Sequence, residues 1–303
     1  MGQLEDMTAF VRIVEAGTLS RAAKQLGVAK SAVSRQLTLL EERLGVQLLQ
    51  RTTRRSSLTE AGRSYYQRAL QILADVGELN AATSKTMAQL TGALKIAVPQ
   101  TFGLQHLSPL MVNFAKAHPG LVLHLDFSDR QVNLVEEGFD VAIRIAELGD
   151  SSLIARRLAP IKIILCASPA YLEHHGTPKN PPDLRRHQTL QYSFGGRSSW
   201  KFVGPDGRAV SAGTGLKLSA SNGAFLRDAA VSGQGIARLP TFIVWREIEN
   251  GTLVRVMADY TIAPLNLYAI YPQTRHLSTR VRALIDFLVK RFDGVPYWDR
   301  SLQ

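Results

Sequence analysis

The N-terminal residues form short amphipathic segments separated by single glycines. Apolar residues recur at helical spacing over residues 4–16, and Gly17 is placed to end that predicted helix as its C-terminal cap. Thr18 is expected to cap a second helix that closes at Leu26, and Gly27 permits the tight turn after it. The pattern therefore predicts two helices, each ended by a glycine.

A third helix is predicted from about residue 30 to residue 44, with one apolar and one polar face. The inner positions are Ala32, Val33, Leu37, Leu40 and Leu44, and the outer ones are Lys30, Ser31, Ser34, Arg35 and Thr38. Residues 46–58 then predict a short β-hairpin, although they contain no Asn-Gly or Asp-Gly turn. The expected tip is basic and carries Arg51, Arg54 and Arg55.

One long helix is predicted from Thr59 to about Leu90. Its apolar or small residues repeat mainly in steps of four and three, which is the spacing of a coiled-coil seam. The seam consists of Tyr65, Ala69, Ile72, Val76, Leu79, Thr83 and Leu90. A second copy of the helix is the expected partner, and packing against the chain's own second domain is the alternative.

Strand-like and helix-like runs alternate after Thr91-Gly92, which favours an α/β architecture with a mostly parallel sheet. The expected strands are 94–98, 122–127, 141–145, 161–167, 216–219, 236–239 and 267–271. The expected helices are 104–116, 132–136, 223–232, 242–249 and 279–291. An irregular segment rich in Gly, Pro, Ser and Arg, residues 178–213, interrupts the alternation, and we predict two lobes.

The composition is that of a globular protein of about two domains, with 303 residues and 45% hydrophobic content. No apolar run approaches the roughly 18 residues that a membrane-spanning helix needs, and the N-terminus lacks the pattern of a signal peptide. Cys166 is the single cysteine, so an intrachain disulfide is excluded. Together these features predict a cytoplasmic protein.

Positive charge is concentrated in residues 20–63, where nine Lys and Arg residues face three Glu residues, an excess of six in a net charge of +11. Such a stretch is either a nucleic-acid-binding surface or an ordinary solvated basic surface. On spacing alone the two interpretations are close, although the start of the third helix has the residues that the first one needs. A helix that enters the major groove needs short polar and basic side chains there, and Arg35 could bond guanine through two nitrogens. The alternative is a three-helix bundle with a polar face.

Residues 4–62 resemble the DNA-binding head of LysR-type transcriptional regulators. The matching segments are Phe10–Thr18, Ala22–Leu26, Ser31–Leu37, Leu40–Leu49, Arg51–Arg54 and Leu58–Gly62. The family often has Gln at the position of Lys30 and Ser or Pro at the position of Ser31. The resemblance implies a winged helix-turn-helix, with Lys30, Ser31, Ser34, Arg35 and Thr38 toward the major groove. Arg51, Arg54 and Arg55 are then expected toward phosphates or the minor groove.

The rest of the chain is similar to one large subgroup of the same family. The segments that carry this similarity are Phe139–Arg144, Asp150–Leu158, Cys166–Leu172, Gly233–Ala237, Tyr271-Pro272 and His276–Ser278. The resemblance implies an effector domain of periplasmic-binding-protein type with two Rossmann-like lobes, and tetramers whose linker helices pair. It divides the chain into a DNA-binding domain (1–60), a linker helix (61–91) and an effector domain (92–303). Lobe I then covers about 92–161 and 268–303, and lobe II about 162–267.

An effector is expected in the cleft between the lobes, beyond the carboxyl ends of the strands. Thr101 matches a family position whose hydroxyl commonly contacts the effector, and Arg144, which ends a strand, would clamp a carboxylate or form a structural ion pair. The other candidates are Phe102, Ser128, Ser168, Tyr192, Phe194, Asn222 and Gly223. An Arg with aromatic neighbours in the cleft favours a small carboxylate as the effector. An aromatic carboxylate is one form of this hypothesis.

Other chemical signals are weaker. Cys166 ends an apolar strand and is expected to be a buried small residue, with a thiol sensor as the alternative. The adjacent His174 and His175 point apart and have no third ligand at metal spacing nearby, so no metal is expected. No nucleophile elbow, phosphate-binding Gly-rich loop or His-Glu-x-x-His motif is present, and no cofactor is expected.

We therefore predict a transcriptional regulator that binds promoter DNA and is controlled by a small-molecule effector. The expected partners are double-stranded promoter DNA, the effector and further copies of the chain in a dimer and tetramer, with RNA polymerase as a further candidate and no membrane. Two other classes stay open at this point: a pure small-molecule receptor and an α/β enzyme. The basic N-terminal head argues against the first, and the lack of a catalytic motif against the second.

Overall fold

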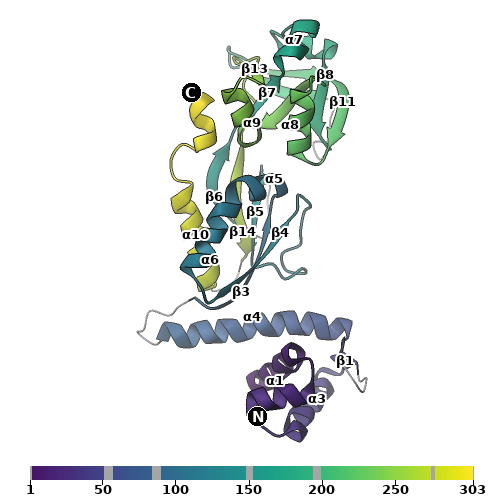
Figure 1. Ribbon diagram of the computed structural model, residues 1–303, viewed down its shortest axis with the longest axis vertical. Coiled ribbons are helices and arrows are strands. Elements are labelled where there is room, and N and C mark those ends of the chain that lie inside the picture. The colour runs from purple at the N-terminus through teal and green to yellow at the C-terminus, as the bar shows by residue number, and fades with distance from the viewer. Residues whose placement is uncertain are drawn as a thin grey trace. The chain divides into compact units, whose positions relative to one another are not determined.

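The computed structural model describes residues 2–50, 57–83, 90–147, 153–193, 199–273 and 277–302 (Figure 1). Its contacts divide the chain into two compact units. The first contains the residues up to Ala93 with two short additions, His118–Val122 and Ser278–Arg280, and the second contains the rest.

The N-terminal unit has the helices and the hairpin that the sequence predicts. Its elements are α1 (Gln3–Ala16), α2 (Leu19–Leu26), α3 (Lys30–Leu44), β1 (Leu49–Gln50), β2 (Ser57–Leu58) and α4 (Glu60–Thr83). The hydroxyl of Thr18 accepts a hydrogen bond from the amide of Arg21 (3.3 Å), so Thr18 caps α2 as expected. Gly27 opens the turn to α3 with a φ of 67°, a left-handed conformation that costs glycine little. β1 and β2 pair antiparallel, which confirms the hairpin.

The core of this unit lies among α1, α2 and α3. Val33, Leu37 and Leu40 of α3 are buried against apolar residues of α1, which include Phe10 and Ile13. Two predictions for the inner face of α3 were wrong, because Ala32 and Leu44 are exposed. The buried stripe follows the spacing 33, 37, 40, 41, so position 32 lies off the stripe and position 44 lies past its end.

The long helix α4 is described as far as Thr83, and its first seam positions face inward. Tyr65 and Ala69 pack with Met7 and Val11 of α1, whereas Ile72 is 40% exposed. The start of the predicted seam is therefore used inside the unit rather than by a second copy. Residues 84–89 lie outside the described residues, and Leu90 is not helical.

The C-terminal unit contains two five-stranded sheets, one in each lobe. The lobe I sheet has the order β4-β3-β5-β14-β6 and the lobe II sheet the order β11-β8-β12-β7-β13. The lobe I strands are β3 (Gly92–Val98), β4 (Leu121–Phe127), β5 (Val141–Ala146), β6 (Leu153–Ile161) and β14 (Leu265–Pro272). The lobe II strands are β7 (Ile163–Ala167), β8 (Gln188–Tyr192), β11 (Gly215–Ala220), β12 (Ile236–Pro240) and β13 (Val254–Val256), with a separate hairpin of β9 (Ser199–Val203) and β10 (Ala209–Gly213).

Each sheet is mixed, which corrects the expectation of a mostly parallel sheet. β3 pairs with β5, and β8 with β11 and β12, in parallel. By contrast, β14 is antiparallel to β5 and β6, and β7 is antiparallel to β12 and β13. The antiparallel strands β6, β7 and β14 are those beside the two points where the chain crosses between lobes.

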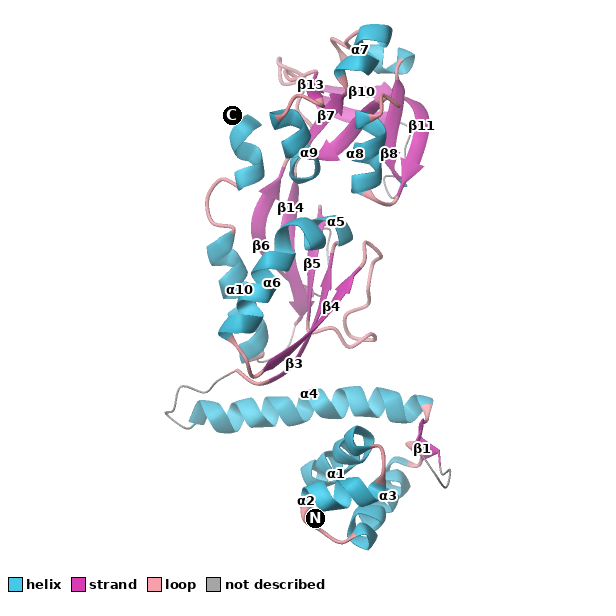
Figure 2. Cartoon of the chain, in the orientation of Figure 1, coloured by secondary structure: helices cyan, strands magenta, loops and turns pink. Residues whose placement is uncertain are grey.

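Helices cover the sheets, and α8 and α9 lie beside the lobe II sheet in Figure 2. The helices are α5 (Gln100–Phe102), the π-helical turn η1 (Gly103–Leu107), α6 (Ser108–Ala117), α7 (Pro169–His175), the 3-10 helix η2 (Pro181–Arg186), α8 (Gly223–Val231), α9 (Thr241–Glu249), α10 (Thr279–Arg291) and the 3-10 helix η4 (Tyr297–Leu302). The predicted helix 132–136 is wrong, because residues 134–138 form a turn in which Glu137 accepts a hydrogen bond from the amide of Asn133. No helix in the described ranges is long and apolar enough to cross a membrane.

Candidate DNA-binding surface and effector cavity

The first turns of α3 present the polar surface that the sequence predicts. Lys30, Ser31, Ser34 and Arg35 are exposed, and Thr38 is half-buried. The buried Val33, Leu37 and Leu40 fix the opposite face of the helix. One side of α3 is therefore held by the core while the other side is free to meet a ligand.

Two polar contacts fix the far half of α3. The carboxylate of Glu41 is buried and accepts hydrogen bonds from the amides of Leu48 (2.7 Å) and Leu49 (3.1 Å), so it ties α3 to the start of the hairpin. Arg43 donates to the carboxylate of Asp6 on α1 at 2.9 Å. The end of α3 that begins at Lys30 is thus its open end, meaning the end whose polar side chains are exposed. Arg51, Arg54 and Arg55, predicted at the hairpin tip, lie outside the described residues.

A cavity of about 610 Å³ lies between the two lobes of the C-terminal unit. Of the predicted effector residues, Thr101, Phe102, Arg144 and Tyr192 line it. Its wall also contains residues that the sequence reasoning missed: Asp129, Ile163, Gln191, Arg238 and Phe242. The volume is within the range of small-molecule sites in proteins.

Thr101 lies at the start of α5, directly after the carboxyl end of β3. The residue is 7% exposed, and its hydroxyl oxygen has no hydrogen-bond partner among the residues that the structure describes. A buried hydroxyl without a partner is costly. In a cavity wall such a group is suited to hydrogen-bond a bound molecule.

Arg144 ends β5 and is fixed by backbone carbonyls. Its guanidinium donates to the carbonyl oxygen of Ser128 (3.3 Å) and to that of Arg130. Burial lowers the pKa of Arg144, and the nearby carboxylate of Asp129 partly offsets that effect. The described contacts of Arg144 are therefore structural, although it lines the cavity.

The remaining predicted residues take other positions. Ser128 accepts a hydrogen bond from the amide of Arg130 (3.2 Å), and Ser168 is buried and caps α7 by accepting one from Tyr171. Neither is part of the cavity wall, because short side chains at strand ends bond their own backbone. Phe194 lies outside the described residues.

Asn222 and Gly223 support the cavity rather than line it. Asn222 caps α8 through the amide of Phe225, and its side chain donates to Gln100 across the lobes at 3.3 Å. A Cβ atom at Gly223 would lie 1.9 Å from the hydroxyl of Tyr192. Gly223 therefore allows Tyr192 to reach the wall.

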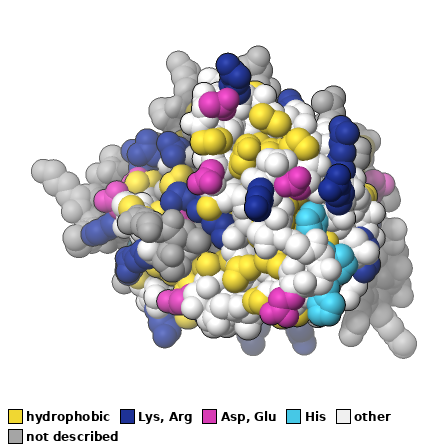
Figure 3. Space-filling view, turned by 90° about the horizontal axis from the view of Figure 1, so that it is seen from above, with side chains coloured by type: hydrophobic (Ala, Val, Ile, Leu, Met, Phe, Trp, Pro, Cys, Tyr) yellow, Lys and Arg dark blue, Asp and Glu magenta, His cyan; other side chains and the backbone are white. Residues whose placement is uncertain are grey.

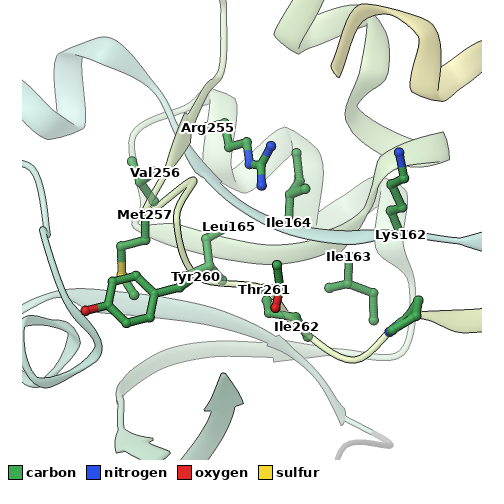
Figure 4. Close-up of a pocket in the computed structure, with 11 residues that line it drawn as sticks. Lys162, Ile163, Ile164, Leu165, Arg255, Val256, Met257, Tyr260, Thr261 and Ile262 are labelled. Carbon is green, nitrogen blue, oxygen red and sulfur yellow. The ribbon is translucent and has the colours of Figure 1, made fainter. Parts of the chain in front are cut away.

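A second cavity of about 340 Å³ lies in lobe II, between β7, β13 and the segment up to Pro264 (Figure 4). Its wall is mostly apolar, with Leu165, Met257, Tyr260 and Ile262 among its members. Arg255, at its edge, donates to the carbonyl of Ala258 at 3.0 Å. None of the described residues in this wall has a buried polar side-chain atom without a hydrogen-bond partner.

A buried aromatic cluster packs against two residues of the effector cavity wall. Phe102 and Phe242, both in the cavity wall, contact each other at 5.0 Å and contact Trp298 of η4 at 5.5 and 6.4 Å between ring centroids. His106 stacks on Phe102, and its Nε2 donates to the carbonyl oxygen of Phe242 at 3.0 Å. The C-terminal segment thus holds residues of both lobes.

The buried His106 predicts a pH dependence of stability. Burial lowers its pKa to about 4 from an ordinary value of 6.5. As the pH falls below about 6.5, His106 is protonated in the unfolded chain but stays neutral in the folded chain. The free energy of unfolding is therefore undiminished by this group above that pH. It falls by roughly 3 kcal/mol as the pH drops toward 4. Urea unfolding at pH 7 and 4.5, followed by tryptophan fluorescence, measures the loss. H106Q should lack this part of the pH dependence, and parallel profiles for the two proteins would disprove it.

The other predicted chemical groups have structural roles. Cys166 is fully buried and burial raises its pKa to about 12, which confirms the small buried residue and argues against a reactive thiol. Figure 3 shows histidine side chains along one edge of the face seen from above. His174 and His175 of α7 each donate from Nδ1 to a carbonyl of their own helix, at 2.8 and 3.0 Å. Over the described ranges, no three His, Cys, Asp or Glu residues are grouped to hold a metal.

A winged helix-turn-helix followed by a two-lobed α/β domain with a central cavity defines a ligand-controlled DNA-binding protein. Comparison with known families agrees: the LysR substrate binding domain matches residues 87–293, and the bacterial regulatory helix-turn-helix domain of the lysR family matches residues 4–63. The chain belongs to the LysR family of transcriptional regulators. It binds DNA in a sequence-specific way and is controlled by an effector.

Individual relatives cover nearly the whole chain. The transcriptional regulator CrgA of Neisseria meningitidis (strain MC58) is 38% identical over 94% of this chain and 96% of its own, and DmlR of Escherichia coli K12 is 36% identical over 95% and 94%. The solved structure of CrgA from N. meningitidis matches with a TM-score of 0.61 at 36% identity, covering 96% of this chain and 99% of that chain. Full-length AphB of Vibrio cholerae matches at 0.59, with 27% identity over 96% and 100%.

Proposed function

We propose that the first turns of α3 read the promoter and that the interlobe cavity holds the effector. Lys30, Ser31, Ser34, Arg35 and Thr38 would face base edges in the major groove, and Arg51, Arg54 and Arg55 would contact phosphates. The single observation that supports this assignment is the division of α3 into a face fixed by the core and an exposed polar face at its open end.

For the effector we propose a small anion such as a carboxylate, bound through groups of the cavity wall. The unpartnered hydroxyl of Thr101 supports this site, together with Tyr192, whose pKa is raised by burial and by Asp129 so that its phenol keeps a proton to donate. Phe102 and Phe242 supply an aromatic surface for the apolar part of the molecule.

The proposed working form is a homotetramer in the cytoplasm that acts on promoter DNA and RNA polymerase and has no enzymatic activity. We propose the domain limits 1–60, 61–91 and 92–303, with α4 pairing between copies through its later positions, since Ile72 is exposed. Half-sites read by one pair of heads should lie about 34 Å apart. If the regulator has two conformational states, one that favours and one that disfavours its action on the promoter, the effector shifts the balance between them. A shift from 1:99 to 99:1 requires that the effector bind one state more tightly by about 5.5 kcal/mol.

Arg35→Ala tests the proposed reading helix. The variant should lose about 1–3 kcal/mol of preference for the operator over random DNA, because a bidentate contact to a base is lost. Gel-shift titrations with the gene's upstream DNA and with random DNA at one salt concentration measure this preference. R12A is the control, since Arg12 of α1 is exposed and bonded to Glu15. Equal losses on both DNAs would assign Arg35 to a phosphate instead.

A further inference from the structure

Arg238 places a positive charge in the middle of the lobe II sheet. It belongs to β12, the central strand in the order β11-β8-β12-β7-β13, and its neighbours along the strand, Ala237 and Leu239, are fully buried. Arg238 is half-buried and lines the effector cavity. A charge at such a position is expensive unless something pairs with it.

No protein group in the described ranges provides that pairing. The guanidinium of Arg238 has no ion pair within 4.0 Å and no hydrogen bond among those residues. Desolvation by burial lowers its pKa, and no carboxylate offsets that effect. The charge is therefore left without a counter-charge among the described residues of the cavity wall.

The other charged groups of the wall do not share this property. The guanidinium of Arg144 bonds two carbonyl oxygens and has the carboxylate of Asp129 nearby. Asp129 itself accepts a hydrogen bond from the amide of Gln100 at 3.0 Å. Glu147 also lines the cavity but is exposed. Of the charged side chains that the structure describes in this wall, Arg238 of lobe II is thus the one whose positive charge is uncompensated.

We propose that the effector is a small monoanion and that Arg238 is the residue that binds its charge, while Arg144 is a positioning residue of lobe I. This proposal rests on the effector cavity proposed above and names the class of molecule that it takes. The hydroxyls of Thr101 and Tyr192 would complete the anion's hydrogen bonds, and Phe102, Ile163 and Phe242 would contact an apolar body.

The test compares full-length wild type, R238Q and R144Q by thermal melting. The probes are benzoate and hexanoate at 10 mM, each with its uncharged primary amide as the matched control. Both carboxylates should raise the melting temperature of the wild type by about 2 °C or more, because a molecule that binds only the folded state stabilises it. Neither amide should do so. R238Q should lose the shift, which corresponds to a loss of affinity of about 30-fold or more.

Melting without a probe separates a binding role from a structural one. R238Q should melt at or above the wild-type temperature, because it removes a half-buried charge that has no partner among the described residues. R144Q should melt lower, because two carbonyl oxygens lose their donor. The proposal is overturned if R238Q melts lower than wild type, if carboxylates shift R238Q as much as wild type, if amides act equally, or if neither carboxylate shifts the wild type.

Gel shifts with the upstream DNA keep this outcome separate from the proposed function. Without probe, the wild type should bind that DNA. If the wild type binds this DNA and any of the overturning results is found, the proposal of a monoanionic effector is wrong, while the proposed DNA-binding function stands. Loss of DNA binding by the wild type itself would contradict the proposed reading helix instead.

Discussion

Replacing Trp298 by alanine is expected to destabilise the C-terminal unit by about 3–5 kcal/mol, the range for removing a large buried aromatic side chain. Trp298 is fully buried, and its ring contacts Phe102, Phe242 and Phe292. Because Phe102 and Phe242 also line the effector cavity, we expect W298A to weaken effector binding as well.

Tryptophan fluorescence measures the unfolding of the C-terminal unit in this variant. All three tryptophans of the chain, Trp200, Trp245 and Trp298, belong to the C-terminal unit, so fluorescence during urea unfolding reports on that unit alone. R300A is the matched control on the same segment, because Arg300 is exposed, and it should change stability by no more than about 0.5 kcal/mol. Equal midpoints for W298A and R300A would show that η4 does not hold the lobes.

Replacing Glu41 by alanine is expected to destabilise the N-terminal unit by about 2–5 kcal/mol. Its buried carboxylate is the acceptor for the amides of Leu48 and Leu49, and each buried donor left without an acceptor costs about 1–3 kcal/mol. The change should also weaken DNA binding, because the hairpin would lose its tie to α3.

Circular dichroism during urea unfolding measures the loss in E41A, while tryptophan fluorescence verifies that the C-terminal unit still unfolds as in the wild type. E41Q is the matched control, since its amide oxygen can still accept one or both hydrogen bonds, and it should lose less. If E41A unfolded at the wild-type urea concentration, Glu41 would not be what positions the hairpin.

The fold was predictable wherever one physical signal dominated. Thr18, Gly27 and the stripe of Val33, Leu37 and Leu40 gave α2 and α3 directly, because capping and periodicity act locally. β6 was largely missed, because it is an edge strand whose Arg156 and Arg157 are exposed. The strands β8, β9 and β10 were missed because they lie in a segment whose Gly, Pro and Ser content is typical of loops.

The candidate site was predictable only in part. Arg144 follows from the rule that ligands bind beyond the carboxyl ends of strands, and Thr101 follows from that rule together with the family resemblance. Tyr192 was a candidate for the opposite wall although the strand that it ends was not predicted. Arg238 was missed, although a charged residue between the apolar Ala237 and Leu239 was a visible signal in the sequence. That no described residue pairs with its charge is a property of the packing of both lobes, which spacing along the chain does not encode.

The most direct test of the central claim is DNA cleavage by iron-EDTA attached to S31C. The native Cys166 is buried and its thiol pKa is raised to about 12, so the reagent should react only at the new site. S31C places the reagent on the first turn of α3. E5C is the control on the same unit. Glu5 is next to Asp6, which pairs with Arg43 at the far end of α3, about 20 Å along the helix from Lys30.

The predicted result is cleavage by labelled S31C within each half-site of the upstream DNA, in the pattern of a reagent in the major groove, with little from labelled E5C. Equal cleavage from both labels, or none from S31C on DNA that the protein still binds, would contradict the assignment of α3 as the helix that reads DNA.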